Sequence, residues 1–238
     1  MIEVIAETGS TNADLAARLR TGEHVTEGDW LVADRQTAGR GRQGREWFDG
    51  AGNFMGSTLV HQRFGDPPAA SLALLAGLAL HEVVAPHLAP AHCALLKWPN
   101  DLMVGQAKLA GILLERQGDA VIVGIGVNLA AAPDLPDRQA VALSALGPAP
   151  GRDSFAADLA RQFDLELARW RNFGLAPIIA RWLAAAHPVG TPLSAGEPGA
   201  PPLTGRFAGL SADGALQLTL ADGTRHIVHA GEVRFAAP

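Results

Sequence analysis

Hydrophobic and polar positions near the start of the chain predict strands that are interrupted by one short helix. Three short apolar runs have the length and composition of strands, at residues 2–6, 30–33 and 54–60. After the first run, a turn leads into a helix predicted over residues 13–19. Thr11 and Asp14 have the spacing of a capping box at the start of this helix. The N-terminal part of the chain therefore combines strands with a helix.

The middle of the chain has one long apolar stretch, which is followed by hairpins. Residues 71–84 are too few for a membrane span and Pro86 follows them, so they predict a buried helix. Turns at residues 105–106 and 118–119 separate three predicted strands, at residues 101–104, 109–115 and 120–129. Because both alternating faces of the last two strands are apolar, we expect this antiparallel sheet to be covered on both sides.

The C-terminal part predicts two helices and then short strands. Apolar and aromatic residues recur at near-helical spacing, at Phe155, Leu159, Phe163 and Trp170. Pro177 is suited to begin a second, shorter helix that runs to residue 186. Residues 188–202 are rich in proline and glycine and predict a boundary, after which Asp-Gly turns at residues 213–214 and 222–223 separate short strands. A segment of this kind suits a small SH3-like barrel.

These elements predict an α+β chain of two domains, with residues 1–187 forming the larger one and residues 188–238 the smaller one. Hydrophobic residues make up 48% of the 238 residues and charged residues only 18%, which indicates extensive burial. The 19 basic and 24 acidic residues give a net charge of −5, so no global positive field is available to hold DNA or RNA.

The cysteine and the N-terminus indicate a cytoplasmic protein. Cys93 is the one cysteine and lies in an apolar run at residues 91–96, so we expect it to fill space in the core. A disulfide within the chain is excluded, which favours a reducing compartment. Residues 1–8 lack the pattern of a signal peptide. The eight histidines show no clustering along the chain, so we expect no zinc site.

The segment between Arg35 and Arg45 is the most unusual in the chain, because three of its four arginines, Arg40, Arg42 and Arg45, alternate with Gly39, Gly41 and Gly44. Glycine lets backbone amides approach an anion and arginine offers a fork of donors, so the pairing suits a phosphate. A solvated basic loop is the alternative, and a chain so poor in charge makes it the weaker one. A dinucleotide-binding fold, with Asp66 as the acidic residue, is excluded because no crossover helix fits before the next strand.

Three further features each allow more than one interpretation. Residues 97–101 could form a turn that holds a base or ribose through Asn100, or a surface turn with Trp98 packed below, and the segment alone does not decide. Lys108 opens a covered strand, so its side chain must reach solvent, which local evidence slightly favours, or meet an anion. Glycines within a buried strand indicate close approach by a ligand or backbone, a bulge or tight helix packing, at Gly124 and Gly126 beside Asn128.

Together these segments resemble the biotin–protein ligases. The shared motifs occur in the family's order within residues 1–130: Ser10-Thr11-Asn12, the GRGRxGR run that ends at Arg45, the KWPND run at residues 97–101, Lys108 to Ile112, and Gly124 to Asn128. The resemblance implies a mixed sheet with helices, of the class II aminoacyl-tRNA synthetase and biotin ligase type, and an SH3-like C-terminal domain. It also implies formation of biotinyl-adenylate from biotin and ATP with Mg²⁺, and transfer of biotin to a carrier lysine.

By the same resemblance, individual residues acquire expected roles. Lys108 and Arg42 are the expected catalytic residues. The expected biotin-binding residues are Ser10, Thr11, Asn12, Gln36, Arg40, Gly41, Arg42, Lys108, Gly124 and Gly126. The expected nucleotide-binding residues are Arg40, Arg42, Arg45, Trp47, Asn100, Lys108, Asn128 and Arg234, with the match loose at Arg234. No residue is assigned to a resident metal.

The resemblance also bears on partners and on competing functions. It implies the biotin carboxyl carrier protein of acetyl-CoA carboxylase as client, no membrane, and a homodimer as one possible state. The motifs begin ten residues from the start, so we expect a ligase that has no DNA-binding domain. A lipoate–protein ligase and a non-catalytic biotin sensor are the two alternatives.

Overall fold

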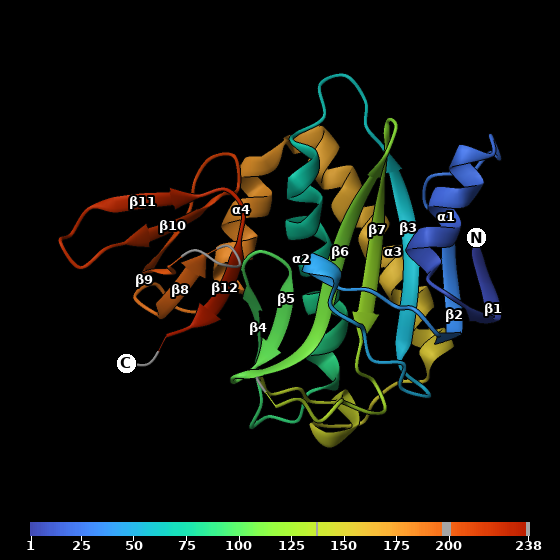
Figure 1. The fold of residues 1–238 in the computed structure, drawn as a ribbon, viewed down its shortest axis with the longest axis horizontal. Helices are drawn as coiled ribbons and strands as arrows, with labels where there is room; N and C mark the ends of the chain where they lie inside the picture. Colours follow the sequence, from blue (N-terminus) through green and yellow to red (C-terminus); the bar gives the residue numbers. More distant parts are fainter. Residues whose placement is uncertain (137, 197–200, 237–238) are drawn as a thin grey trace.

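A seven-stranded sheet forms the larger part of the computed structural model, which describes residues 1–136, 138–196 and 201–236 (Figure 1). Its strands lie in the order β1-β2-β3-β7-β6-β5-β4. Their bounds are β1 (Ile2–Thr8), β2 (Trp30–Gln36), β3 (Phe54–His61), β4 (Ala94–Lys97), β5 (Asp101–Val104), β6 (Ala107–Gln117) and β7 (Ala120–Val127). β1 and β2 pair in parallel and the other neighbours are antiparallel, which confirms the mixed sheet.

Strand β7, at the centre of this sheet, divides its side chains between two faces. Val121, Val123, Ile125 and Val127 belong to the larger hydrophobic cluster. Ile122 belongs to a second cluster, with Leu15, Val25, Leu31 and Leu59. Because side chains of a strand alternate in direction, the two clusters lie on opposite faces, and the predicted two-sided cover is confirmed.

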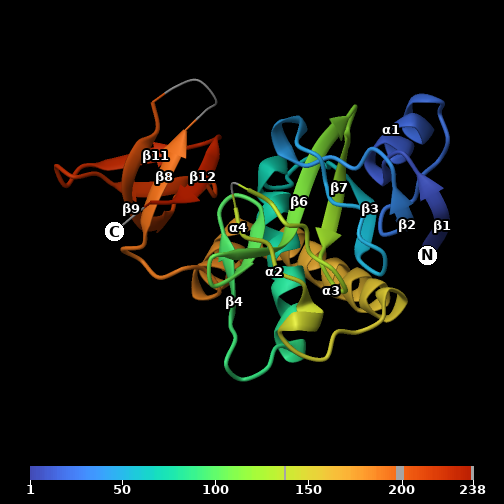
Figure 2. The same ribbon diagram turned by 60° about the horizontal axis from the view of Figure 1, so that its bottom comes forward.

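The two faces are covered by α1 (Thr11–Arg20), α2 (Leu72–Val84) and α3 (Arg152–Phe173), while α4 (Leu175–Ala184) packs against α2 and α3 (Figure 2). Short 3₁₀ turns are η1 (Arg42–Gly44), η2 (Ala69–Ser71), η3 (Ala85–His87) and η4 (Leu143–Ala145). Aromatic contacts fasten α3 to the sheet, because the Phe54 and Phe155 rings lie 5.4 Å apart and the Trp30 and Phe163 rings 5.6 Å apart. The predicted helices are present, although Pro177 is the third residue of α4 rather than its first.

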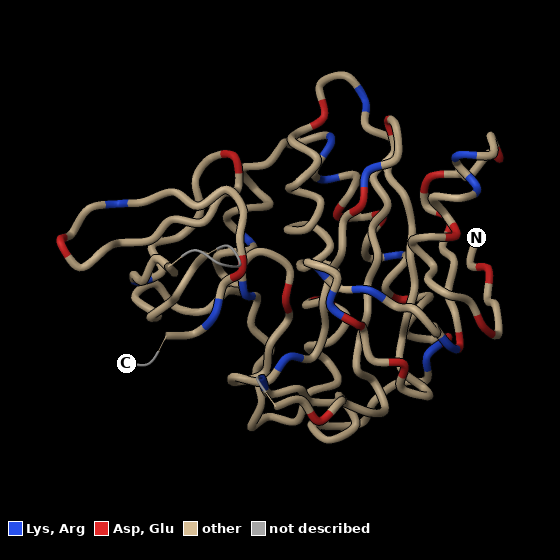
Figure 3. Tube along the Cα trace, in the orientation of Figure 1, with Lys and Arg blue, Asp and Glu red and all other residues tan. Residues whose placement is uncertain are grey.

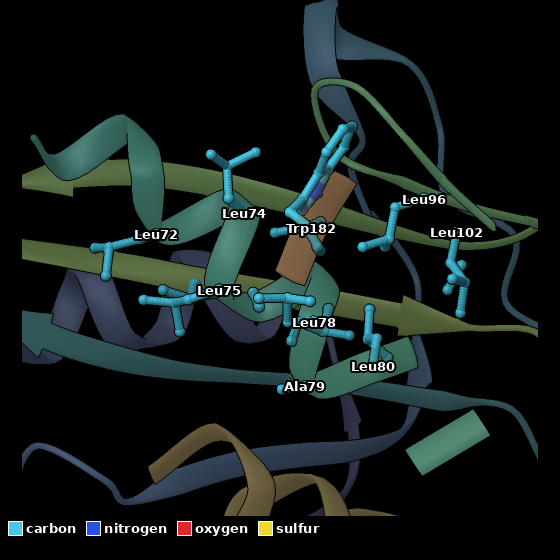
Figure 4. Close-up of a cluster of buried hydrophobic side chains, with 14 of the residues drawn as sticks. Leu72, Leu74, Leu75, Leu78, Ala79, Leu80, Leu96, Leu102 and Trp182 are labelled. Carbon is cyan, nitrogen blue, oxygen red and sulfur yellow. The ribbon is translucent and has the colours of Figure 1, made fainter. Parts of the chain in front are cut away.

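Helix α2 is apolar and buried on all sides over residues 72–80 because it lies in the core of the large domain. The stretch Ala69–His87 has the length and hydropathy of a candidate membrane span, with a mean hydropathy of 1.6. In the fold, 61% of that window is buried, and Leu72, Leu75 and Leu78 lie among sheet and helix side chains (Figure 4). The packing therefore supports the prediction of a buried helix.

A second, five-stranded antiparallel sheet follows, in the order β11-β10-β9-β8-β12. Its strands are β8 (Pro192–Gly196), β9 (Leu203–Leu210), β10 (Leu216–Thr219), β11 (Arg225–Val228) and β12 (Glu232–Phe235). The predicted Asp-Gly turns lie between β9, β10 and β11, where Gly214 and Gly223 have φ of 85° and 83°. β8 falls within the proline- and glycine-rich stretch 188–202, so that stretch is partly strand.

The two sheets are joined by hydrogen bonds from the segment 97–101. Lys97 Nζ donates to the Val233 carbonyl at 2.9 Å, and Trp98 Nε1 donates to the Gly214 carbonyl at 3.0 Å. Trp98 is 6% exposed, so its ring is buried at this junction. This segment is therefore an interdomain contact rather than a free surface turn.

Two local predictions are wrong. Cys93 is exposed, not core, because it lies just before β4 at the end of a surface loop. The capping box at α1 is also absent: the N-cap is Ser10, with no side-chain cap hydrogen bond. Asp14 instead accepts a hydrogen bond from Thr8 Oγ1 at 2.6 Å. Thr11 is directed into the protein, where it has other partners.

Candidate active site

A cavity of about 980 Å³ lies over the glycine-bearing face of the large sheet and reaches strand β12. The fifteen predicted binding residues all line it: Ser10, Thr11, Asn12, Gln36, Arg40, Gly41, Arg42, Arg45, Trp47, Asn100, Lys108, Gly124, Gly126, Asn128 and Arg234. They come from segments far apart in the sequence, including strands of both sheets. The fold therefore brings together what the motifs suggested, while the role of each residue stays a prediction.

One end of the cavity is built from neutral polar side chains at the start of α1. The backbone nitrogen of Thr11 donates to Gln36 Oε1 at 2.7 Å, and Thr11 Oγ1 lies 3.1 Å from the same oxygen. Thr11 Oγ1 also lies 2.6 Å from Ser57 Oγ. All three residues are at least nine-tenths buried, so this end offers fixed hydrogen-bonding groups away from water.

The glycines of β7 make room for two side chains at the floor of the cavity. A Cβ at Gly124 would overlap the Asn12 amide, and a Cβ at Gly126 would overlap the Trp47 indole. Of the interpretations left open for Gly124 and Gly126, the structure therefore supports close approach by another group. The groups that approach the two glycines are side chains. Trp47 lies between this floor and Lys108, whose Nζ is 5.6 Å from the ring centroid.

The arginine–glycine loop folds on itself as a small hairpin. Gly41 N donates to the Arg45 carbonyl at 2.7 Å, and Trp47 N donates to the Gly39 carbonyl at 2.9 Å. Gln43 at its tip has a φ of 58°, in the left-handed region. The amide of Gly41 is therefore occupied within the loop, so the loop offers an anion its arginine side chains rather than that amide.

Two arginines of this loop bind the C-terminal sheet. Arg42 donates to Asn100 Oδ1 at 3.4 Å and to the Gly231 carbonyl at 3.1 Å. Arg45 forms an ion pair with Glu232 on β12. Desolvation lowers the pKa of Arg42, against the opposing effect of Asp101, but a guanidinium remains charged at neutral pH. The loop is thus held over the cavity by contacts with β12, and the solvated-loop alternative does not describe it.

Two lysines share the buried carboxylate of Asp101. Lys108 Nζ lies 2.5 Å from Oδ1, and Lys97 Nζ lies 3.0 Å from Oδ2. Burial raises the pKa of Asp101, but the two lysines outweigh it and lower the pKa from 3.8 to about 2. The slightly favoured solvent-directed Lys108 is therefore wrong, because an anion of the same chain lies within reach.

Other predicted nucleotide contacts have structural partners as well. Asn100 Nδ2 donates to the Ile112 carbonyl at 2.6 Å. Asn128 Nδ2 donates to the Val141 carbonyl at 3.3 Å, while its buried Oδ1 has no hydrogen-bond partner among the described residues. Arg234 is 62% exposed in its side chain and donates to Glu232. Asn128 thus keeps one acceptor unused at the cavity wall.

Sequence reasoning missed three residues that line this cavity, Ser57, Asp101 and Glu232, and also Glu115, which binds Asn12 from outside the lining. Ser57 is fully buried in β3, and the Gly-Ser-Thr sequence inside an otherwise apolar strand was the available signal. Asp101 lies in a segment that was recognised, but its pairing with Lys108 depends on the adjacent strands β5 and β6. Glu115 and Glu232 gave no sequence signal, since their partners lie 103 and 187 residues away.

Positive charge in the cavity arises from local convergence. Figure 3 shows basic and acidic residues interspersed along the chain. Arg42, Arg45, Lys97 and Lys108 nevertheless all line the one cavity. Among the described residues, no group of three or more His, Cys, Asp or Glu side chains is placed to hold a metal ion. Asp101, the buried carboxylate nearest to the lysines, is taken up by them.

Comparison with known proteins shows the family to which the chain is related. Residues 5–129 match the biotin/lipoate A/B protein ligase family, and residues 196–235 match the biotin protein ligase C-terminal domain. The biotin–[acetyl-CoA-carboxylase] ligase of Paracoccus denitrificans is 40% identical, over 98% of this chain and 99% of that protein. The chain belongs to the biotin–protein ligase family.

Two further relatives support this membership of the biotin–protein ligases. The biotin–[acetyl-CoA-carboxylase] ligase of Mycobacterium tuberculosis is 38% identical, over 98% of this chain and 88% of that protein. The structure of the biotin protein ligase from Aquifex aeolicus in complex with biotin and ATP is similar over 99% of each chain, with a TM-score of 0.84 and 26% identity. The C-terminal sheet of the family is thus present here as well as the large one.

Proposed function

We propose that this biotin–protein ligase forms biotinyl-adenylate and pyrophosphate from biotin and ATP, and then transfers biotin to a lysine of a biotin carboxyl carrier protein. The observation that carries the proposal is the pairing, in one cavity, of buried neutral hydrogen-bonding groups around Thr11 with the cations Arg42 and Lys108. A substrate for such a cavity has a neutral polar head and an anionic end. Biotin, with its ureido ring and carboxylate, is such a molecule.

Recognition of the ureido ring is assigned to the neutral end. Ser10, Thr11, Asn12 and Gln36 are each at least nine-tenths buried and supply donors and acceptors at fixed positions. Because Gly124 and Gly126 have no side chains, the ring would have room to lie beside Asn12 and Trp47. Arg40 and Gly41 lie next to this end in the cavity lining. A ligand that lacks a ureido group would leave several of these groups unpaired, which disfavours it strongly.

Activation is assigned to the cationic end. A carboxylate oxygen of biotin attacks the α-phosphorus of ATP, the bond to the bridging oxygen breaks, and pyrophosphate leaves with the bond electrons. Both reactants are anions, so the step needs positive charge where the carboxylate and phosphate meet. Lys108 is suited to the carboxylate and Arg42 to the phosphate, with Arg40, Arg45, Trp47, Asn100, Asn128 and Arg234 as the further nucleotide-binding set.

Mg²⁺ is proposed to arrive as part of the ATP complex, since Asp101 is neutralised by two lysines and is a poor ligand for a cation. In the second step the amine of the carrier lysine attacks the mixed anhydride, an amide forms, and AMP leaves. Stabilisation of the departing AMP is assigned to Lys108. The adenylate would stay enclosed beneath the loop that Arg42 and Arg45 fasten to β12.

The proposal includes a cytoplasmic location and the carrier domain of acetyl-CoA carboxylase as client, without DNA or a membrane as partner. The single exposed thiol of Cys93 has no disulfide partner in the chain, which favours a reducing compartment. A homodimer is compatible with the edge strand β1, where Val4 is 47% exposed. Sedimentation velocity of the purified chain would decide its oligomeric state.

The first experiment is ATP–pyrophosphate exchange by the purified chain, with biotin or lipoate as the acid. We expect exchange with biotin and little with lipoate, followed by a mass increase of one biotinyl group on an apo carrier domain. Exchange with lipoate alone would assign the chain to the lipoate ligases. Biotin binding with no pyrophosphate release would make it a sensor. Either result would overturn the proposal.

A further inference from the structure

Glu115 lies on β6. It is the outermost member of a chain of hydrogen bonds that runs through Asn12 and Ser57 to Thr11. Its Oε2 accepts a hydrogen bond from Asn12 Nδ2 at 2.6 Å. A carboxylate can only accept, so the nitrogen of the Asn12 amide must face Glu115 and the oxygen must face the opposite way. Asn12 Oδ1 indeed lies against Ser57, inside the cavity wall.

The orientation of Asn12 determines what Ser57 does. Ser57 Oγ lies 2.6 Å from Asn12 Oδ1, and because an amide oxygen only accepts, Ser57 must donate there. A hydroxyl has one proton, so Ser57 can only accept at its second contact, the 2.6 Å contact with Thr11 Oγ1. Thr11 is therefore the donor to Ser57, and the direction of the chain is set from Glu115 inward.

This direction fixes the polarity that the cavity offers to a ligand. The hydroxyl proton of Thr11 is used in the 2.6 Å contact with Ser57 and not in the 3.1 Å contact with Gln36 Oε1, so the lone pairs of Thr11 Oγ1 remain to accept. Gln36 Oε1 is occupied by the Thr11 amide at 2.7 Å, so the Gln36 amide nitrogen remains to donate. An acceptor beside a donor is the complement of a cyclic urea, in which an N–H adjoins a C=O.

We propose that Glu115 is a positioning residue that sets this polarity and thereby tunes selection of the ureido head. The inference rests on the proposed function and adds to it a residue that lies outside the cavity lining. Glu115 acts through Asn12 and Ser57 and touches no reacting atom. Without a carboxylate at this position, the Asn12 amide can turn over and donate to Ser57. Ser57 then donates to Thr11 Oγ1. This hydrogen bond occupies a lone pair of Thr11 that would otherwise accept from the ligand.

The test compares Glu115→Lys, which offers only donors, with Glu115→Gln, which keeps an acceptor without the charge. Biotin binding is measured by calorimetry in the absence of ATP, and KM for biotin and for ATP by pyrophosphate exchange. We expect Glu115→Lys to weaken biotin binding by about tenfold, the worth of one ligand hydrogen bond, and to leave kcat and the KM for ATP little changed. Glu115→Gln should bind biotin within about twofold of the parent.

A matched control separates polarity from charge. Asp119→Lys makes the same charge change at an exposed residue of the adjoining hairpin turn and should leave biotin binding unaltered. If Glu115→Gln weakens binding as much as Glu115→Lys, or if Asp119→Lys does so, charge is responsible and the proposal is wrong. Should Glu115→Lys fail to fold, Glu115→Ala replaces it, with a weakening expected in the same direction.

A double-mutant cycle tests transmission through Ser57. Ser57→Ala removes the hydroxyl that links Asn12 to Thr11, so in that background Glu115→Lys should cause no further loss of biotin affinity. Additive losses would overturn the proposal, because they would mean that Glu115 acts by another route. If the parent chain shows no biotin-dependent exchange, the proposed function fails; if the parent is active and Glu115→Lys binds biotin normally, only this inference fails.

Discussion

The ammonium group of Lys108 and the carboxylate of Asp101 form an ion pair with 2.5 Å between nitrogen and oxygen, and the carboxylate also binds Lys97. The side chain of Asp101 is only 13% exposed, so two positive charges are held close together by one buried negative charge. The pair keeps Lys108 at the cavity wall in the absence of substrate. Its importance can be tested by acid, by substitution and by kinetics.

Acid should weaken the fold through Asp101. The pKa of Asp101 is lowered from 3.8 to about 2 in the folded chain, so its ionised form favours folding. This contribution is fully present above pH 3.8, is lost as the pH falls through about 2, and amounts to about 2 kcal/mol. Urea unfolding between pH 5 and pH 2 should therefore show a steeper loss for the parent than for Asp101→Asn. Parallel losses would contradict the assignment.

Asp101→Asn should itself destabilise the fold at neutral pH. The substitution leaves Lys97 and Lys108 facing each other without the charge that pairs them. Breaking a buried pair in this way typically costs about 3 kcal/mol or more. Urea unfolding at pH 7 measures the loss, and Asp119→Asn, an exposed change in a nearby turn, serves as the control. An unchanged free energy of unfolding would show that the pair contributes nothing.

Lys108→Ala and Arg42→Ala should each lower the rate of adenylate formation by about a hundredfold, because each removes one positive group from the place where charge builds up. Single-turnover pyrophosphate release measures this rate, and near-ultraviolet circular dichroism checks that the variants remain folded. Arg116→Ala, an exposed arginine on the same strand as Lys108, is the matched control. Near-normal release by either variant would refute its catalytic role.

Glu232→Ala should let biotinyl-adenylate escape faster. The substitution removes the ion pair between Arg45 and Glu232 on β12. This pair is partly shielded from water, because the Arg45 side chain is 33% exposed and the Glu232 side chain 25% exposed. We expect the adenylate to dissociate up to about fivefold faster, consistent with a pair worth about 1 kcal/mol. Glu46→Ala changes the charge of the same loop without touching β12 and provides the control. Equal dissociation from the parent and Glu232→Ala would show that this pair does not retain the loop.

Gly126→Ala should damage binding more than its size suggests. An added Cβ would overlap the Trp47 indole, so the ring must leave the floor of the cavity. We expect biotin affinity to fall by about tenfold or more and stability by about 1–3 kcal/mol. Calorimetry and urea unfolding measure the two effects. Gly151→Ala, where an added Cβ would meet its nearest atom at 3.8 Å, changes a residue outside the cavity lining and should leave biotin affinity unchanged.

The sequence predicted the fold well because each strand is marked by its own apolar run and by the turn residues beside it. The hairpins from residue 101 onward and the helix at α2 follow from local turns and apolar runs, and all are present. Predictions for individual residues failed where the interaction partner lies far away in the sequence. The capping role given to Thr11 failed because its hydroxyl contacts Gln36 and Ser57, which lie on strands β2 and β3. Cys93 was misplaced because an apolar run can also end in a surface loop.

The motifs indicated many residues of the cavity lining but none of the contacts between them. All fifteen residues to which the motifs pointed line the cavity, since each motif lies within one short segment. The contacts of Lys108 with Asp101 and of Arg45 with Glu232 depend on strand pairing and on the meeting of two sheets. Neither can be read from spacing, because the residues are brought together only by the completed fold.

Strand β7 assigns its odd-numbered and even-numbered positions to different tasks. Val121, Val123, Ile125 and Val127 contribute to the main core, whereas Gly124 and Gly126 border the ligand cavity. The cavity side of the strand is already without side chains at these two glycines, so the room above it is set by Asn12 and Trp47, which lie over Gly124 and Gly126. An engineer who wishes to admit a biotin analogue with a bulkier ring would therefore shorten Asn12 or Trp47 and leave the odd-numbered positions, which hold the core, unchanged.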